Sequence, residues 1–280
     1  MDPIARGVTM QPFTRVLLGP VVLFLAPALL SARAQTPRQE SRTNAVPIVV
    51  EPVGELRKGV NAWPLIVSPA NDAERRVNAT LTKLNERLAK ALRDCDADYL
   101  AWARQTGNDH SQIADDWSRA VAITMQGPRY LSLVASEEMF CGGAHPNEDQ
   151  IALVFDMNTG RPVNWVALVA KSSGASSSTD SVADGSNAGA LILPDLRAMS
   201  VAAASADCKD AFQDPQSYVL WPDAKKERLV AQPFDLPHAV MACSVEMKLT
   251  MEQARKMGFN DSLLTAIAEA HRRSVTAPAP

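Results

Sequence analysis

The residues best suited to chemistry in this 280-residue chain lie in one short loop between two strand-like runs. The loop reads Cys141-Gly142-Gly143-Ala144-His145-Pro146-Asn147. The imidazole of His145 can act as a general base or bind a metal ion. The two glycines allow backbone conformations that other residues avoid. Loops of this kind often carry recognition or catalysis.

Asp156 and His238 are the side chains that could work with His145. The carboxylate of Asp156 could orient the imidazole across the hairpin, as in a catalytic dyad. It could equally accept hydrogen bonds from the amides of the turn Asn158-Thr159-Gly160. With His238, the pair would make a set of two histidines and one carboxylate, which binds iron. Spacing alone does not show that the three side chains converge, so these interpretations stay open.

The usual motifs of catalysis are missing from the sequence. It contains no Gly-x-Ser-x-Gly elbow for a serine nucleophile and no glycine-rich loop of the phosphate-binding types. We therefore expect no catalytic residue, no metal and no cofactor, and we interpret the loop and its neighbours as a binding or structural motif. Its residues are Gly142, Gly143, His145, Asn147, Asp156 and His238.

Four cysteines, Cys95, Cys141, Cys208 and Cys243, form the next candidate set. No two of them have the Cys-x-x-Cys spacing of a zinc site. An even number of cysteines in an exported chain predicts two disulfide bonds, for which three pairings exist. We favour Cys95–Cys141 and Cys208–Cys243, because each bond closes a loop within one half of the chain.

Residues 1–34 have the pattern of a secretory signal. Arg6 and Arg15 supply positive charge, the apolar run 16–30 follows, and Ser31-Ala32-Arg33-Ala34 offers a cleavage site before Gln35. The alternative is a membrane anchor, but the run is shorter than the ~20 residues of a spanning helix and contains prolines. We expect a periplasmic or secreted protein with no membrane span after cleavage.

The charge balance narrows the class of partner. Cleavage removes three basic residues and one acidic residue from totals of 28 and 31, which leaves 25 and 30 and a formal charge of −5. A mildly acidic protein is a poor match for nucleic acid, which favours a basic face. The balance is compatible with a basic protein as partner.

One long helix is the clearest of the elements that must position these residues. Asn71 is a candidate N-cap with Glu74 three residues later, at the spacing of a capping box. We expect the helix to end near Gly107. Its apolar positions recur at helical spacing, which indicates a face packed on the core. They are Val77, Leu81, Leu84, Leu88 and Leu92.

Beyond this helix the apolar period changes to two. Strand-like runs at 117–126, 129–140 and 150–157, continued at 161–169, are separated by turn signals. This pattern predicts a meander of antiparallel strands. Before the helix, 45–53 has strand composition with two prolines, which predicts an edge strand or extended arm.

The last part of the chain is predicted to hold a hairpin, a further strand and short helices. The hairpin comprises 218–221 and 228–231, and the strand spans 239–249. Thr250 and Asn260 are the candidate N-caps of two helices. The sequence therefore predicts an α+β fold, in which an antiparallel meander packs with a long N-terminal helix and short C-terminal helices.

Two segments have the composition of unstructured chain. Residues 171–190 are rich in serine, glycine, alanine and aspartate and hold almost no large apolar side chain. Such a segment cannot bury enough surface to order itself, so we predict a flexible insert. The alanine- and proline-rich end, 271–280, is expected to be disordered.

Several motifs resemble a family of extracytoplasmic domains of unknown function, DUF3298. The resemblance rests on Gly142 to Pro146, Phe155-Asp156 and Thr159-Gly160, and later on Asp235-Leu236-Pro237-His238 with Cys243. Trp63-Pro64-Leu65 with Asn78 is similar to DUF4163, a companion segment that commonly precedes the domain. The resemblance covers about 63–270. It implies a DUF4163-like segment (63–127) and a DUF3298-like domain (128–270) that contains the flexible insert. Composition places a signal peptide (1–34) and a leader and edge segment (35–62) before them and a tail (271–280) after them.

The resemblance implies recognition rather than a reaction. In the anti-sigma factor RsiV this domain is a receptor for lysozyme, and in the peptidoglycan deacetylase PdaC catalysis belongs to a separate domain. We therefore expect an exported binding protein for a cell-envelope partner, such as a lysozyme-like wall hydrolase or a secreted toxin, with an inhibitor, immunity or sensor role. The alternative is an enzyme or accessory domain acting on peptidoglycan through His145, Asp156 and His238.

Overall fold

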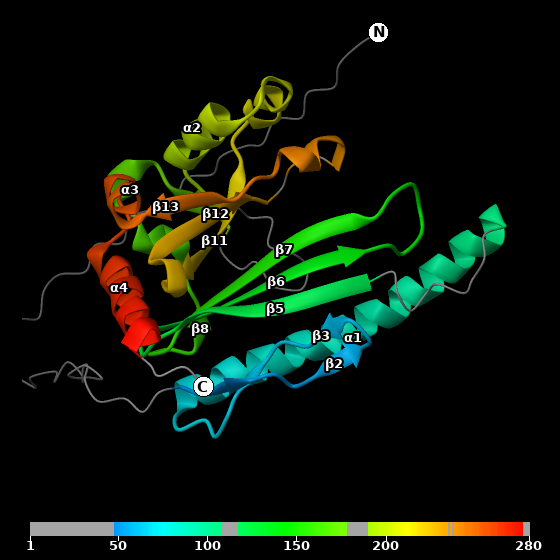
Figure 1. Ribbon diagram of the computed structural model, residues 1–280, viewed down its shortest axis with the longest axis horizontal. Helices are drawn as coiled ribbons and strands as arrows, with labels where there is room; N and C mark the ends of the chain where they lie inside the picture. The colour runs from blue at the N-terminus through cyan, green and yellow to red at the C-terminus, as the bar shows by residue number, and fades with distance from the viewer. Residues whose placement is uncertain (1–47, 108–116, 178–189, 235, 237, 277–280) are drawn as a thin grey trace, which may run out of the picture. The chain divides into compact units, whose positions relative to one another are not determined.

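The computed structural model describes residues 48–107, 117–177, 190–234, 236 and 238–276, all within one compact unit, 42–280. A long helix, a six-stranded sheet and a five-stranded sheet form three layers (Figure 1). Most strands pair antiparallel. The α+β class predicted from the sequence is confirmed. The predicted signal segment, 1–34, lies outside the described residues.

The long helix, α1 (Asp72–Thr106), begins and ends where its sequence predicts. The Asn71 side chain accepts a hydrogen bond from the Glu74 amide at 3.0 Å, and the Glu74 carboxylate accepts one from the Ala70 amide at 2.6 Å. These contacts satisfy amides that the first turn leaves without helical partners. Gly107 ends the helix in the left-handed conformation, at φ 73°.

The larger sheet carries the motif loop. Its strands, in spatial order, are β2 (Glu55–Arg57), β3 (Val60–Asn61), β5 (Trp117–Gln126), β6 (Tyr130–Met139), β7 (Asn147–Asp156) and β8 (Arg161–Pro162). The β5, β6 and β7 strands form the predicted meander, and β3 pairs parallel with β5. A separate two-stranded ribbon joins β1 (Val50–Glu51) to β4 (Leu65–Ile66).

The smaller sheet is built around the predicted hairpin. Its strands, in spatial order, are β13 (Met247–Thr250), β12 (Arg228–Pro233), β11 (Ser217–Asp223), β10 (Leu191–Ile192) and β9 (Ser176–Ser177). The remaining helices are α2 (Pro194–Ala203), α3 (Met251–Lys256) and α4 (Asp261–Thr276). Short 3-10 turns complete the fold at η2 (Trp165–Leu168), η3 (Lys171–Ser173), η4 (Ala206–Phe212), η5 (Ala224–Lys226) and η6 (His238–Cys243).

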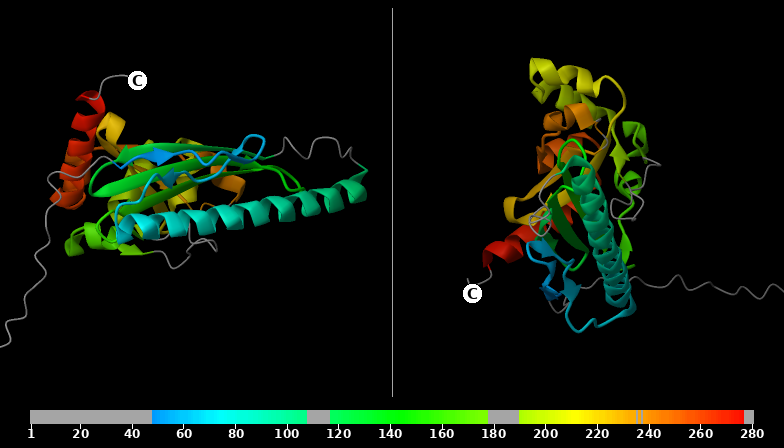
Figure 2. Two further views of the ribbon diagram at one scale, coloured as in Figure 1. Left: turned by 90° about the horizontal axis from the view of Figure 1, so that it is seen from below. Right: turned by 90° about the vertical axis from the view of Figure 1, so that its right-hand side faces the viewer.

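The larger sheet has a core on each face, because successive side chains of a strand point to opposite sides. On one face, Leu131 and Leu133 of β6 pack with Leu81 of α1. On the other face, Tyr130 and Val134 pack with the smaller sheet and α4. The views in Figure 2 show α1 running along its face of the sheet.

Two asparagines fasten the segment before α1 to the helix itself. Asn78 bonds the amide and the carbonyl of Ile66 at 2.8 and 2.9 Å, and Asn85 does the same for Trp63 at 2.7 and 3.0 Å. A side-chain amide has both a donor and an acceptor, so each asparagine satisfies one backbone position completely. Asn78 is the helix residue that the DUF4163 resemblance singles out.

Both predicted disulfide pairings are confirmed: Cys95 bonds Cys141, and Cys208 bonds Cys243. The first joins α1 to the loop after β6, and the second joins η4 to η6. Within the described ranges, no helix is both long enough and apolar enough to cross a membrane.

Other local expectations differ from the structure. The strand predicted at 239–249 is wrong in its first half: η6 occupies 238–243, where Cys243 is bonded to η4, and pairing begins only at Met247. The fourth strand of the meander ends at Pro162, because Asn164 caps η2. The predicted insert, 171–190, begins with η3 and β9, and 178–189 lies outside the described residues. The α4 helix extends into the predicted tail, as far as Thr276.

Candidate acidic groove between the two sheets

The motif loop lies at the tip of the β6–β7 hairpin and is fastened to α1 at its base. Cys141 is bonded to Cys95 of the helix. Gly142 follows at φ 95°, and a Cβ placed there would lie 2.7 Å from the Cβ of Trp102. Phe140 packs edge-on against Trp102, with 5.1 Å between the ring centroids. Only glycine combines this positive φ with such close contact, which explains its place in the loop.

The structure separates the two residues that could have formed a catalytic dyad. His145 is exposed, with Nδ1 3.3 Å from the carbonyl oxygen of Pro146. The Asp156 carboxylate accepts a hydrogen bond from the Asn158 amide at 2.8 Å and pairs with Arg129 at 3.3 Å. The β7 strand runs from Asn147 to Asp156, so about 30 Å of strand separates its ends. His145 and Asp156 therefore do not share a site.

The other motif residues lie at different places. Asn147 is the first residue of β7, and His238 is the first residue of η6. Asn147 lines the groove described below, together with Pro146. No group of three or more histidine, cysteine, aspartate or glutamate side chains that could hold a metal ion occurs in the described part of the chain.

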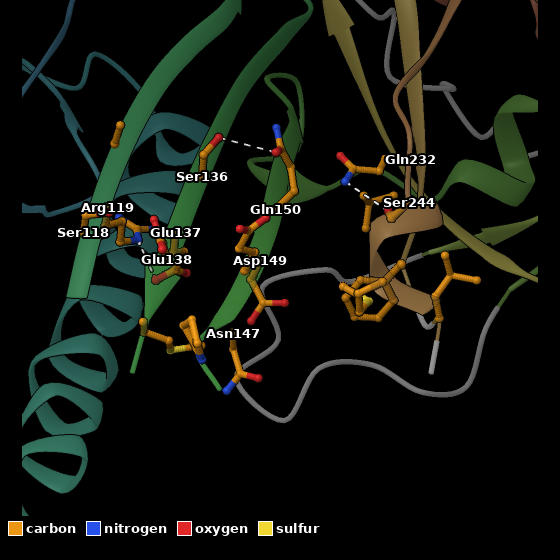
Figure 3. A pocket seen from close by; sticks show the side chains of 18 of the residues that line it. Ser118, Arg119, Ser136, Glu137, Glu138, Asn147, Asp149, Gln150, Gln232 and Ser244 are labelled. Atoms are coloured by element: carbon orange, nitrogen blue, oxygen red, sulfur yellow. Dashed lines mark hydrogen bonds and ion pairs between the residues drawn. The ribbon is translucent and has the colours of Figure 1, made fainter. Parts of the chain in front are cut away.

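The main hollow beside the motif loop is a groove of about 1080 Å³ between the two sheets, which we call the acidic groove. One wall comes from the ends of β5, β6 and β7, and the other from β12 and η6 (Figure 3). Its carboxylates are Glu55, Glu137, Glu138, Glu148 and Asp149. Arg119 is the one basic side chain among the described residues that line it.

The register of the hairpin brings the carboxylates together in pairs. Glu138 lies directly across from Glu148, and Glu137 lies directly across from Asp149. Val134 packs toward the smaller sheet, and Glu138 lies four residues later on the same strand, so both side chains point to the same face. The Glu138–Glu148 pair therefore lies on the face that borders the groove. Like charges directly opposite each other destabilise a sheet. The pair therefore destabilises the folded hairpin, so stability does not explain why these two carboxylates lie opposite each other.

Glu137 is a special case, because it is buried and paired. Arg119 Nε lies 3.5 Å from its carboxylate, and Trp117 Nε1 donates a hydrogen bond to it at 3.1 Å. Burial raises the pKa of Glu137, and the nearby Asp149 raises it further, while Arg119 and Trp117 oppose the shift.

Arg119 has further contacts that fix it in place. Nη1 donates to the carbonyl oxygen of Asn61 at 2.6 Å, and the guanidinium lies 4.3 Å from the centre of the Trp63 ring. Arg119 therefore pairs with Glu137 and joins β3 and the Trp63 side chain to β5. The negative character of the groove comes from its other carboxylates.

The opposite wall is polar and apolar but carries no charge among its described residues. Gln232 Nε2 donates to Ser244 Oγ at 3.2 Å, and Ser244 Oγ donates to the carbonyl oxygen of Pro233 at 2.9 Å. Phe234 and Met241 add apolar surface. Lysine and arginine combine an aliphatic stem with a cationic head, so a groove with one acidic and one mixed wall suits them.

Part of this site could be found in the sequence. Glu137-Glu138 and Glu148-Asp149 lie at equal distances from Gly143, so a hairpin centred there places them opposite each other. The sequence motif predicted the loop between them but not the carboxylates. The wall from Gln232, Ser244 and Met241 had no local signal, because it depends on how the second sheet packs.

Comparisons with known proteins give similarities to solved structures alone. No protein-family model and no curated protein matches the sequence. The chain is similar to the crystal structure of a member of the DUF3298 family from Bacteroides fragilis, at 13% identity and a TM-score of 0.44. The match covers 79% of this chain and 95% of that one. The family is the one that the sequence motifs resemble.

Proposed function

We propose that this chain is an exported binding protein that holds a basic surface of a cell-envelope partner in the acidic groove. The observation that carries the proposal is the cross-strand pair Glu138 and Glu148, which lines the groove at a cost to the sheet. A cationic group between the two carboxylates removes their repulsion. Binding of the cationic group therefore regains the free energy that this repulsion costs the folded protein.

The dimensions of the groove suit a protein surface rather than one small ion. A volume of about 1080 Å³ exceeds that of a single side chain and lies slightly above the usual range for small-molecule sites. Several lysine or arginine side chains from a neighbouring protein fit such a space. The negative charge of the groove also attracts a basic partner during its approach, which speeds association.

The proposed partner is a basic wall hydrolase of the lysozyme type, or a basic secreted toxin. The motif resemblance suggests this class, and the negative charge of the groove is complementary to it. Two disulfides are typical of proteins outside the cytoplasm, where such partners occur. Holding the partner would give an inhibitor, immunity or sensor role.

Calorimetry of the chain without residues 1–34 against a basic lysozyme tests this proposal. Replacing Glu138→Gln and Glu148→Gln together should weaken binding about tenfold or more, because two charge-assisted contacts are lost. The matched control removes two carboxylates outside the groove, Asp98→Asn and Glu252→Gln, both exposed. It should bind like the unmodified protein.

Two results would overturn the proposal. One is no binding of lysozyme or of other basic secreted proteins at micromolar concentration. The other is an equal loss of affinity in the groove variant and in the control, which would show that net charge alone attracts the partner.

A further inference from the structure

A second hollow, of about 480 Å³, lies between α1 and β8, and we call it the basic groove. Its charged lining residues are Arg76, Lys83, Arg87 and Arg161. No described residue of this lining is acidic, and the lining shares no residue with the acidic groove. The two hollows are therefore separate sites of opposite charge.

Helical spacing puts the cations of α1 in one row. Arg76, Thr80, Lys83 and Arg87 follow one another at intervals of four, three and four, which is one face of a helix. Lys83 and Arg87, four residues apart, are like charges that disfavour the helix by a few tenths of a kcal/mol. Solvation of these cations does not require them to be aligned along one hollow.

The opposite wall is held close to the helix by the turn before β8. Arg76 Nε donates to the carbonyl oxygen of Thr159 at 2.8 Å, which joins the helix to the turn. Gly160 lies at φ 67°, and an added Cβ there would overlap the carbonyl of Ala73. Only glycine permits this contact, so the turn places Arg161 at a fixed position beside the helical row.

We propose that the basic groove binds a linear polymer that carries phosphate groups. At a rise of 1.5 Å per residue, Arg76 and Lys83 are about 10 Å apart along the helix, and Lys83 and Arg87 about 6 Å. One phosphate cannot reach all of these positions, whereas a chain of phosphates can meet each in turn. Arginine matches phosphate with two parallel hydrogen bonds.

The shape of the hollow favours a chain over a flat surface. Leu84, Ala79 and Pro162 give it an apolar floor, and the cations stand around that floor. A narrow chain fits between the helix and β8, where a membrane surface would touch only the rim. The protein as a whole is acidic, so general attraction to polyanions is absent and binding must come from this local site.

Polyphosphate titrated into the chain without residues 1–34, at several salt concentrations, tests the proposal. The variant Lys83→Gln with Arg161→Gln should bind about tenfold more weakly or worse. It should also lower the slope of log affinity against log salt by about 1.4, since each phosphate contact to a flexible strand contributes about 0.7. The control, Lys209→Gln with Arg272→Gln, removes two exposed cations elsewhere and should change neither quantity.

The outcomes distinguish binding in the basic groove from a general charge effect and from binding to a membrane. Equal losses in variant and control would overturn the proposal, as would a lack of polyphosphate binding by the unmodified protein. Binding to phosphatidylglycerol vesicles but not to polyphosphate would also overturn it, in favour of a membrane surface. Circular dichroism should show both variants folded, and the lysozyme affinity should remain unchanged in both, because the acidic groove is intact.

Discussion

The two halves of the β6–β7 hairpin have the same backbone pairing and different surroundings. Near the β5–β6 turn, the hairpin is buried on both faces, with Leu133 toward α1 and Val134 toward the smaller sheet. Toward the motif loop, the same strands carry Ser136, Glu138 and Glu148, and the space beside them is the acidic groove. We call these the packed half and the open half.

The difference shows how one hairpin can serve stability and recognition together. Ladder hydrogen bonds do not depend on which side chains a strand carries, so the strands continue unchanged into the open half. The packed half buries the apolar area that stabilises the hairpin. It thereby offsets the repulsion of Glu138 and Glu148 in the open half.

The largest expected contrast comes from truncating a side chain in each half. Leu133 is fully buried, so Leu133→Ala should lower the free energy of unfolding by about 2–5 kcal/mol. Ser136→Ala in the open half should change it by less than about 0.5 kcal/mol. Urea unfolding measures both, and similar effects at the two positions would remove the distinction between the halves.

The Cys95–Cys141 bond should hold the open half to α1. Replacing both cysteines by alanine should cost about 2–4 kcal/mol of stability, since the bond closes a loop of 46 residues. Replacing Cys208 and Cys243 should cost a similar amount, because that loop has 35 residues. Hydrogen exchange should show faster opening of 139–147 only in the first variant; equal protection of this segment in both would contradict the anchoring role.

The two loop glycines make a matched pair, and the expected difference in stability between their alanine variants is smaller than the disulfide effect. Gly142 and Gly143 both have positive φ, so alanine at either should cost about 1–2 kcal/mol. At Gly142 the new Cβ also meets Trp102, which should add about 1–3 kcal/mol, whereas at Gly143 nothing lies within 4 Å. Thermal unfolding should rank Gly142→Ala below Gly143→Ala, and the reverse order would show that Trp102 does not anchor the loop.

A pH experiment addresses the buried carboxyl at the boundary of the two halves. Burial raises the pKa of Glu137 above its ordinary value of 4.5, so the folded protein binds the proton more tightly than the unfolded chain. Its contribution to stability is present at low pH and is lost as pH rises through the folded pKa. The stability of the unmodified protein relative to Glu137→Gln should therefore fall as pH rises above the ordinary pKa of 4.5. A rise over this range would mean that Arg119 dominates over burial.

The features that the sequence predicted correctly have local causes. The Asn71 cap, the apolar stripe of α1 and the Gly107 end need only neighbouring residues, and the turns of the meander do too. The disulfide pairings were accessible because each closes within one half of the chain. These local features are present in the folded structure because tertiary packing favours the same conformations.

The features that the sequence did not predict depend on distant packing. The apolar run at 239–243 has strand composition, yet the bond from Cys243 to Cys208 holds it in η6. The acidic groove needs both the hairpin register and the position of the second sheet. The separation of His145 from Asp156 follows from the length of β7, which becomes clear only once the strand's bounds are known.

Hydrogen exchange of the protein with and without a basic lysozyme tests the central claim most directly, because it reports where the partner binds. We expect slower exchange in the open half, at 136–139 and 147–150, with no change at 76–87 of α1. Protection confined to α1, or no protection of the open half in a complex shown to form, would contradict the assignment of the acidic groove as the binding site.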